Sequence, residues 1–228
     1  MKCNYCSQMI NRNLTLAEIF LPKKIVSEQL CSQCTQKFQL LKTKGTCQGC
    51  QRQTQNRYCS DCLKWQQLYP QYDFHHEALF SYNQAMQEWF EEYKFKGNYR
   101  LRYSFVSFLQ AYFKQKRGFI VIPMPISQER MAVRGFNQVE GLLEAAGVDY
   151  QPYLVRFADG HSQVTKTRSE RLQLVQPFEL TKEGQKAVSN KSVLLVDDIY
   201  TTGRTIFHGA QVILENHPAE LYTFSLAR

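Results

Sequence analysis

The sequence predicts an α/β protein in which a parallel sheet flanked by helices follows a small N-terminal cysteine-rich module. Residues 193–196 are four consecutive Val and Leu residues, a pattern that favours a strand buried on both faces, as in a parallel sheet. All eight cysteines precede residue 63, and each belongs to a Cys-x-x-Cys pair. With 228 residues and 43% hydrophobic content, the chain suffices for one sizeable domain and a small one.

The cysteines predict two metal sites. The four pairs are Cys3/Cys6, Cys31/Cys34, Cys47/Cys50 and Cys59/Cys62. A Cys-x-x-Cys knuckle directs two thiolates at one tetrahedral ion, so four knuckles predict two Zn²⁺ sites of four thiolates each. Disulfides and redox-active pairs are the alternatives. We expect a cytosolic chain, in which disulfides are rare, and a redox-active pair would not need to occur four times. The spacing leaves the pairing open between a sequential and an interleaved arrangement.

Basic charge is concentrated in residues 1–70, which contain ten Lys or Arg and three Asp or Glu. Residues 71–228 are nearly balanced, with eighteen basic and seventeen acidic residues. A positive surface favours a polyanion, although solvated lysines that only maintain solubility are the alternative. We expect residues 1–70 to form a zinc-binding module held folded by its metal, and residues 71–228 to form a second domain. Residues 62–82, with Pro70, are predicted to be the linker.

The remaining chain alternates between strand and helix patterns. Strands are expected at residues 74–82, 119–125, 153–157, 193–196 and 221–226, and helices at residues 86–95, 101–113 and 206–214. Residues 94–100 interleave basic and aromatic side chains in what we expect to be an exposed turn. That composition suits a single nucleic acid strand, on which aromatic rings stack and cations neutralise phosphates.

A phosphate site is predicted where the 193–196 strand ends. Asp197 and Asp198 come first, and the loop residues Thr201, Thr202, Gly203, Arg204 and Thr205 follow. The free N–H groups and the dipole of a helix N-terminus favour an anion, and glycine permits close approach of the backbone. Carboxylates accept hydrogen bonds from sugar hydroxyls and bind hydrated Mg²⁺. Ribose 5-phosphate has this layout; the alternative is an ordinary acidic turn before a capped helix.

This stretch resembles the phosphoribosyl pyrophosphate (PRPP) motif of type I phosphoribosyltransferases. The resemblance implies that fold, with PRPP bound together with Mg²⁺. It implies that Asp197 and Asp198 are the catalytic acids, which contact the ribose hydroxyls. It assigns the 5-phosphate to Thr201, Thr202, Gly203, Arg204 and Thr205. Arg134 follows the strand at residues 119–125, where such enzymes hold pyrophosphate.

The whole chain is similar to the ComF family of naturally transformable bacteria. The similarity rests on Pro123-x-Pro125 followed by Arg-Gly-Phe-Asn-Gln at residues 134–138, on the four knuckles and on the Asp-Asp motif. It implies a competence factor for DNA uptake and transformation that binds PRPP or another sugar phosphate. It further implies that the protein handles single-stranded DNA with a ComFA-type helicase/translocase. The alternative is an active phosphoribosyltransferase that transfers ribose 5-phosphate from PRPP to an unidentified acceptor.

Two further expectations concern the surroundings of this site. In transferases of this class, a polar segment such as residues 159–170 is a flap that closes over the site, although an ordinary surface loop is the alternative. No apolar run approaches the roughly eighteen residues of a membrane span, and no signal-peptide pattern follows Met1. We therefore expect a cytoplasmic protein that partners recruit to the membrane uptake machinery.

Overall fold

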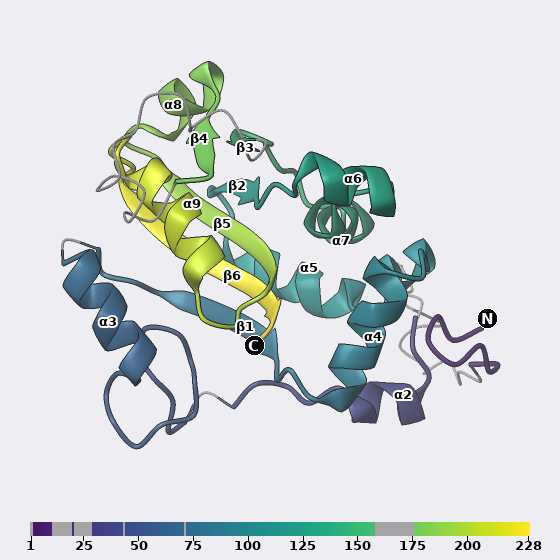
Figure 1. The fold of residues 1–228 in the computed structure, drawn as a ribbon. Coiled ribbons are helices and arrows are strands. Elements are labelled where there is room, and N and C mark those ends of the chain that lie inside the picture. Colours follow the sequence, from purple (N-terminus) through teal and green to yellow (C-terminus); the bar gives the residue numbers. More distant parts are fainter. Residues whose placement is uncertain (1, 11–19, 21–28, 43, 71, 158–175) are drawn as a thin grey trace.

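A four-stranded parallel sheet forms the centre of the molecule in the computed structural model, which describes residues 2–10, 20, 29–42, 44–70, 72–157 and 176–228 (Figure 1). The strand order is β1-β6-β5-β2. The strands are β1 (His76–Phe80), β2 (Ile120–Pro123), β5 (Ser192–Ile199) and β6 (Glu220–Ala227). The predicted parallel sheet is thereby confirmed, and the predicted strand at residues 193–196 is the buried part of β5.

Residues of β5 alternate between two apolar cores because successive side chains of a strand point to opposite faces. Leu194 and Val196 pack into one core, and Val193 and Leu195 pack into the other. The first core is covered by α4 (Gln84–Lys94), α5 (Val106–Gln115) and α7 (Gln138–Ala146). The second is covered by α9 (Arg204–Leu214) and an antiparallel pair, β3 (Leu154–Arg156) with β4 (Phe178–Leu180).

Several elements differ from the expectation. The helix predicted at residues 101–113 is divided into a 3₁₀ helix, η1 (Tyr99–Tyr103), and α5. After β2 the chain forms α6 (Gln128–Arg134) and then α7, neither of which was predicted, and Ser127 and Asn137 cap these two helices. The predicted linker begins inside a helix, α3 (Ser60–Leu68), which ends before Pro70. Two short helices were not predicted, α2 (Ser32–Lys37) and α8 (Lys182–Val188). The predicted flap lies outside the described residues.

The cysteine-rich part contributes to both cores. Cys3 and Cys34 belong to the core beneath α4 and α5, whereas the four cysteines from Cys47 to Cys62 belong to the core beneath α9. In Figure 1, α2 and α3 accordingly lie on opposite sides of the molecule. In the segment between α2 and α3, Leu40 forms an antiparallel bridge with Phe80, the last residue of β1. The domain boundary near residue 70 stays a prediction.

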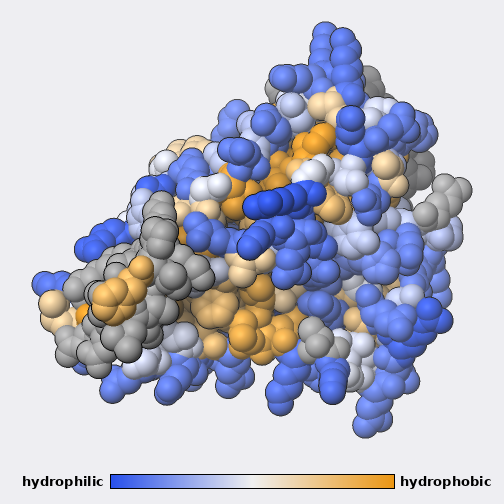
Figure 2. Space-filling view, turned by 180° about the vertical axis from the view of Figure 1, so that it is seen from behind, coloured by the Kyte–Doolittle hydropathy of each residue, from blue (hydrophilic) through white to orange (hydrophobic). Residues whose placement is uncertain are grey.

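Within the described part of the chain, no helix combines the length and the apolar character that crossing a bilayer requires. Seen from the reverse side, the surface is mainly hydrophilic, with apolar side chains gathered in its middle (Figure 2). Trp89, Phe105 and Phe224 are among the largest side chains that are fully buried.

A buried histidine joins the first strand to its neighbour. The ring nitrogens of His76 lie 3.0 Å from the hydroxyls of Thr223 and of Ser225 on β6. Burial, and secondarily the positive charge of Arg228, lower the pKa of His76 well below 6.5. The ring is therefore neutral in the folded protein, where both of its nitrogens have partners.

His76 should make the stability pH-dependent. Because its folded pKa lies below its unfolded value of 6.5, its contribution is complete above that pH and is lost as the pH falls toward the folded pKa. The loss should approach about 1.4 kcal/mol per pH unit. Urea denaturation between pH 7 and 5 should show this slope as the difference in unfolding free energy between the wild type and His76→Gln, because the other titrating groups are common to both proteins. His75→Gln at the half-exposed neighbouring position is the control, and an unchanged slope in His76→Gln would contradict the assignment.

Candidate functional site

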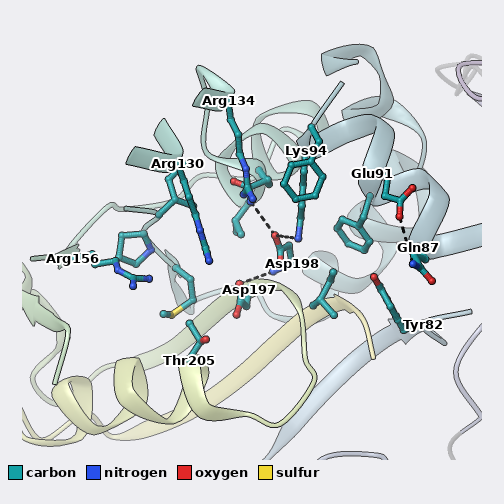
Figure 3. Close-up of a pocket in the computed structure, with 18 residues that line it drawn as sticks. Tyr82, Gln87, Glu91, Lys94, Arg130, Arg134, Arg156, Asp197, Asp198 and Thr205 are labelled. Carbon is teal, nitrogen blue, oxygen red and sulfur yellow. Dashed lines mark hydrogen bonds and ion pairs between the residues drawn. The ribbon is translucent and has the colours of Figure 1, made fainter. Parts of the chain in front are cut away.

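A cavity of about 370 Å³ opens at the carboxyl ends of β2 and β5 (Figure 3). Parallel sheets commonly bind ligands at this edge, where the strands end and loops diverge. Helix α4, helix α6, the start of α9 and strand β3 contribute the rest of the lining. Its charged residues are Glu91, Lys94, Arg130, Arg134, Arg156, Asp197 and Asp198.

The two predicted acids end β5 and differ in their contacts. Asp198 Oδ2 lies 2.7 Å from Lys94 Nζ and accepts a hydrogen bond of 3.3 Å from the Gln138 side chain. Asp197 Oδ1 accepts a hydrogen bond of 2.8 Å from the backbone N–H of Asp198. Burial, followed by the charge of Asp198, raises the pKa of Asp197 to about 7. Asp197 is thus a carboxyl group that gains or loses its proton near neutral pH and would be stabilised as an anion by an added cation.

The cations of the cavity face these acids. Lys94, Arg130 and Arg134 extend from their helices toward Asp197 and Asp198 in Figure 3. Arg130 and Arg134 are four residues apart on α6, so they lie on the same face of that helix. Burial, and then the nearby Arg130, lower the pKa of Arg134. Two cations held this close favour an anion between them.

The loop between β5 and α9 forms a smaller hollow beside the cavity. It is lined by the predicted residues Asp197, Thr201, Thr202, Gly203, Arg204 and Thr205. Gly203 is the N-cap of α9 and has a φ of 83°, in the left-handed region that glycine adopts most readily. A Cβ atom at this position would also collide with the Tyr200 hydroxyl. Asp197 and Thr205 line both spaces, so the hollow and the cavity are adjacent.

The structure therefore brings Asp197, Asp198, Thr205 and Arg134 together around one cavity, with the other loop residues alongside. Their roles in ligand binding stay a prediction. Two cations of the cavity were not predicted, namely Lys94 and Arg156. Lys94 was expected in an exposed turn, yet its side chain is 12% exposed and ion-paired. The sequence contains a signal for this, because Lys94 is four residues after the buried Phe90 and so shares its helix face. Its Nζ lies 4.5 Å from the centre of that ring.

The cysteines form two tetrads by sequential pairing. The first tetrad is Cys3, Cys6, Cys31 and Cys34, and the second is Cys47, Cys50, Cys59 and Cys62, with the sulfur atoms of each within 4.8 Å of one another. All eight are free of disulfide bonds. Cys6 Sγ lies 3.7 Å from Cys31 Sγ, and Cys50 Sγ lies 3.6 Å from Cys59 Sγ. A tetrahedron with Zn–S bonds of about 2.3 Å has edges of about 3.8 Å. Both tetrads can therefore hold a metal ion such as zinc.

Backbone N–H groups point at the sulfur atoms in both tetrads. The N–H of Cys31 donates to Cys3 Sγ over 3.3 Å, and the N–H of Cys59 donates to Cys47 Sγ over 3.2 Å. Such donors stabilise thiolates, the form of cysteine that binds metals. The second tetrad is entirely buried, whereas Cys6 in the first is exposed.

Comparisons with known proteins were made by sequence and by structure. No family model matches the chain. Among solved structures, a similar one is an allosteric regulatory enzyme of purine biosynthesis, 18% identical, with a TM-score of 0.36 over 54% of this chain and 24% of that one. A Trypanosoma cruzi hypoxanthine phosphoribosyltransferase is 18% identical, with a TM-score of 0.33 over 56% of this chain and 63% of that one. Likeness at this level says nothing about activity.

Curated relatives match the chain along its length. "Competence protein ComFC" of Bacillus subtilis (strain 168) is 28% identical, over 99% of this chain and 94% of the relative. "Competence protein ComFC" of Streptococcus pneumoniae (strain ATCC BAA-255 / R6) is 39% identical, over 100% of both chains. Identity of that extent over the complete length shows the family, and this chain belongs to the ComFC competence proteins.

Proposed function

We propose that this protein is a competence factor for DNA uptake and natural transformation that binds PRPP or a related sugar phosphate together with Mg²⁺. It handles single-stranded DNA with a ComFA-type helicase/translocase partner. The family name supports the role in competence. The observation that supports the ligand is the cavity in which Lys94, Arg130 and Arg134 face Asp197 and Asp198 beside a helix N-terminus.

PRPP matches this arrangement group by group. Its ribose hydroxyls and Mg²⁺ suit the two carboxylates, and its 5-phosphate suits the N–H groups of the 201–205 loop. Its pyrophosphate suits Arg130 and Arg134, since guanidinium groups bind phosphate oxygens in pairs. The cavity of about 370 Å³ lies in the size range of small-molecule sites.

Lys94 is part of this proposal as the group that holds Asp198 before ligand binds. Its ion pair of 2.7 Å with Asp198 is largely shielded from solvent, which fixes the position of the carboxylate within the cavity. When Mg²⁺ or a ribose hydroxyl takes the place of Lys94 at Asp198, the released ammonium group is within the same cavity as the phosphates. The positive charge of Lys94 therefore stays in the cavity after the ligand has bound.

For single-stranded DNA, the proposal rests on exposed basic residues outside the cavity. In the cysteine-rich part these are Lys2, Lys37, Lys42, Lys44, Arg52, Arg57 and Lys64. Lys96 and Arg100 are exposed in the 94–100 segment, together with the Phe95 ring, which is 69% exposed. An exposed ring among cations can stack on a base while the cations neutralise phosphates.

The proposed metal is zinc, and purified protein should contain two zinc ions per chain because the thiolates form two tetrads. Elemental analysis of the intact protein measures this. Cys6→Ser and Cys50→Ser should each lower the content to one ion, since each removes a ligand from a different tetrad. One zinc in the wild type, with four cysteines reactive to a thiol reagent, would contradict the second site.

PRPP with Mg²⁺ should raise the melting temperature of the wild-type protein. At one hundred times the dissociation constant, the expected stabilisation is about 2.7 kcal/mol. The double variant Asp197→Asn with Asp198→Asn should lose this shift, whereas Glu179→Gln, an exposed acid on β4, should keep it. Because the pKa of Asp197 is about 7 and its anion favours Mg²⁺, affinity should fall as the pH drops below 7. A full shift in the double variant would refute the site.

Binding of single-stranded DNA should weaken with salt in proportion to the phosphates neutralised. Replacing both Lys42 and Lys44 with Gln should lower the slope of log affinity against log salt by about 1.4, at roughly 0.7 per contact. Lys182→Gln on α8 is the matched control, exposed and distant from the cysteine-rich part in Figure 1. Fluorescence anisotropy with a labelled oligonucleotide measures the slope. Equal slopes in both variants would remove the basic surface from the proposal.

A further inference from the structure

Helix α3 begins inside the second tetrad. Cys59 is its N-cap and Cys62 lies in its first turn, so two of the four thiolates define where the helix starts. No side chain caps this end. A helix of nine residues is marginal in water by itself, and its order depends on what it is attached to. A metal ion bound by the second tetrad would supply that attachment.

One residue of α3 contacts the phosphate loop directly. Trp65 is three residues after Cys62, on the same side of the helix. Its Nε1–H donates a hydrogen bond of 2.9 Å to the backbone carbonyl of Thr202. Its ring stacks on Phe207 in the first turn of α9, with centroids 4.2 Å apart and planes within 13°. The indole therefore contacts both the loop and the helix that the loop begins.

A second connection reaches the other end of the loop. The Arg228 guanidinium donates to Cys50 Sγ over 2.9 Å and also to the carbonyl of Cys50. The same group lies 5.1 Å from the centre of the Tyr200 ring, directly before the loop. The backbone N–H of Tyr200 in turn donates to the Ala227 carbonyl over 3.0 Å. The second tetrad thus has contacts leading to both sides of residues 201–203.

We propose that Trp65 is a positioning residue that couples the second cysteine tetrad to the phosphate loop. The carbonyl of Thr202 and the N–H of Gly203 belong to one planar trans peptide, in which the two groups point in opposite directions. By holding that carbonyl toward α3, Trp65 directs the Gly203 N–H away from α3. Metal in the second tetrad preserves this orientation, which a bound 5-phosphate requires. The inference rests on the proposed sugar-phosphate function of the loop.

The test compares two conservative changes on α3. Trp65→Phe keeps an aromatic ring against Phe207 and removes the N–H donor. Tyr69→Phe removes a hydrogen bond from the same helix to Gln211 on α9 without touching the loop. Calorimetry with Mg²⁺ measures the affinity for PRPP and for ribose 5-phosphate. Both affinities should fall about fivefold in Trp65→Phe, because the variant loses one hydrogen bond to the loop. Tyr69→Phe should bind as the wild type does, and both variants should keep their zinc.

A reciprocal measurement needs no variant. If metal in the second tetrad favours ligand binding, then ligand must favour metal retention by the same factor. In an equilibrium competition with a coloured chelator, saturating PRPP should therefore raise the chelator concentration needed to remove one of the two zinc ions of the wild type. Trp65→Phe should reduce this protection, and Tyr69→Phe should retain it.

The outcomes separate this inference from the proposed function. Wild-type protein that binds neither PRPP nor ribose 5-phosphate would overturn both. Wild-type protein that binds them, with undiminished affinity in Trp65→Phe, would overturn the coupling and leave the site intact. Ligand binding that leaves the equilibrium affinity for both zinc ions unchanged would also overturn the coupling, whether or not Trp65→Phe folds.

Discussion

Burial of β5 between β2 and β6 is the constraint on which the rest of the structure depends. Its strand pairs are parallel on both sides, and its side chains enter the two cores alternately. Only where the strand leaves the cores can charged residues follow, so Asp197 and Asp198 come at its end. Helix α4, which covers one core, then supplies Lys94 across the cavity, and α6 supplies Arg134. The position of the acids is a consequence of packing as much as of chemistry.

The sequence motif was sufficient to predict the acids and the 201–205 loop, because these residues are neighbours along the chain and share one local geometry. Helix α6, which carries Arg130 and Arg134, was not predicted. Helix α6 has seven residues and none of them is buried, so no apolar periodicity reveals it. Arg156 comes from β3, which is three residues long. The tertiary fold brings these arginines to the cavity of Asp197, and the spacing of residues along the chain does not predict that.

The cysteine spacing predicted the ligands but not their surroundings. Basic charge and low apolar content pointed to a separate N-terminal unit. The described structure shows two knuckle pairs that pack against different faces of the same sheet. Phe207, from the far end of the sequence, belongs to the same core as the second tetrad, and Arg228 donates a hydrogen bond to Cys50 Sγ. The cysteine spacing within residues 1–70 cannot predict which residues from the rest of the chain pack against the tetrads.

The unequal burial of the two tetrads has a chemical consequence. Thiolate oxidation requires access of the oxidant to sulfur. Cys6 is exposed in the first tetrad, whereas every sulfur of the second is covered by the fold. Peroxide would therefore reach the first centre while the second remained protected. Damage would begin on the side of the sheet covered by α4 and α5, and the centre beneath α9 would be the last to release its ion.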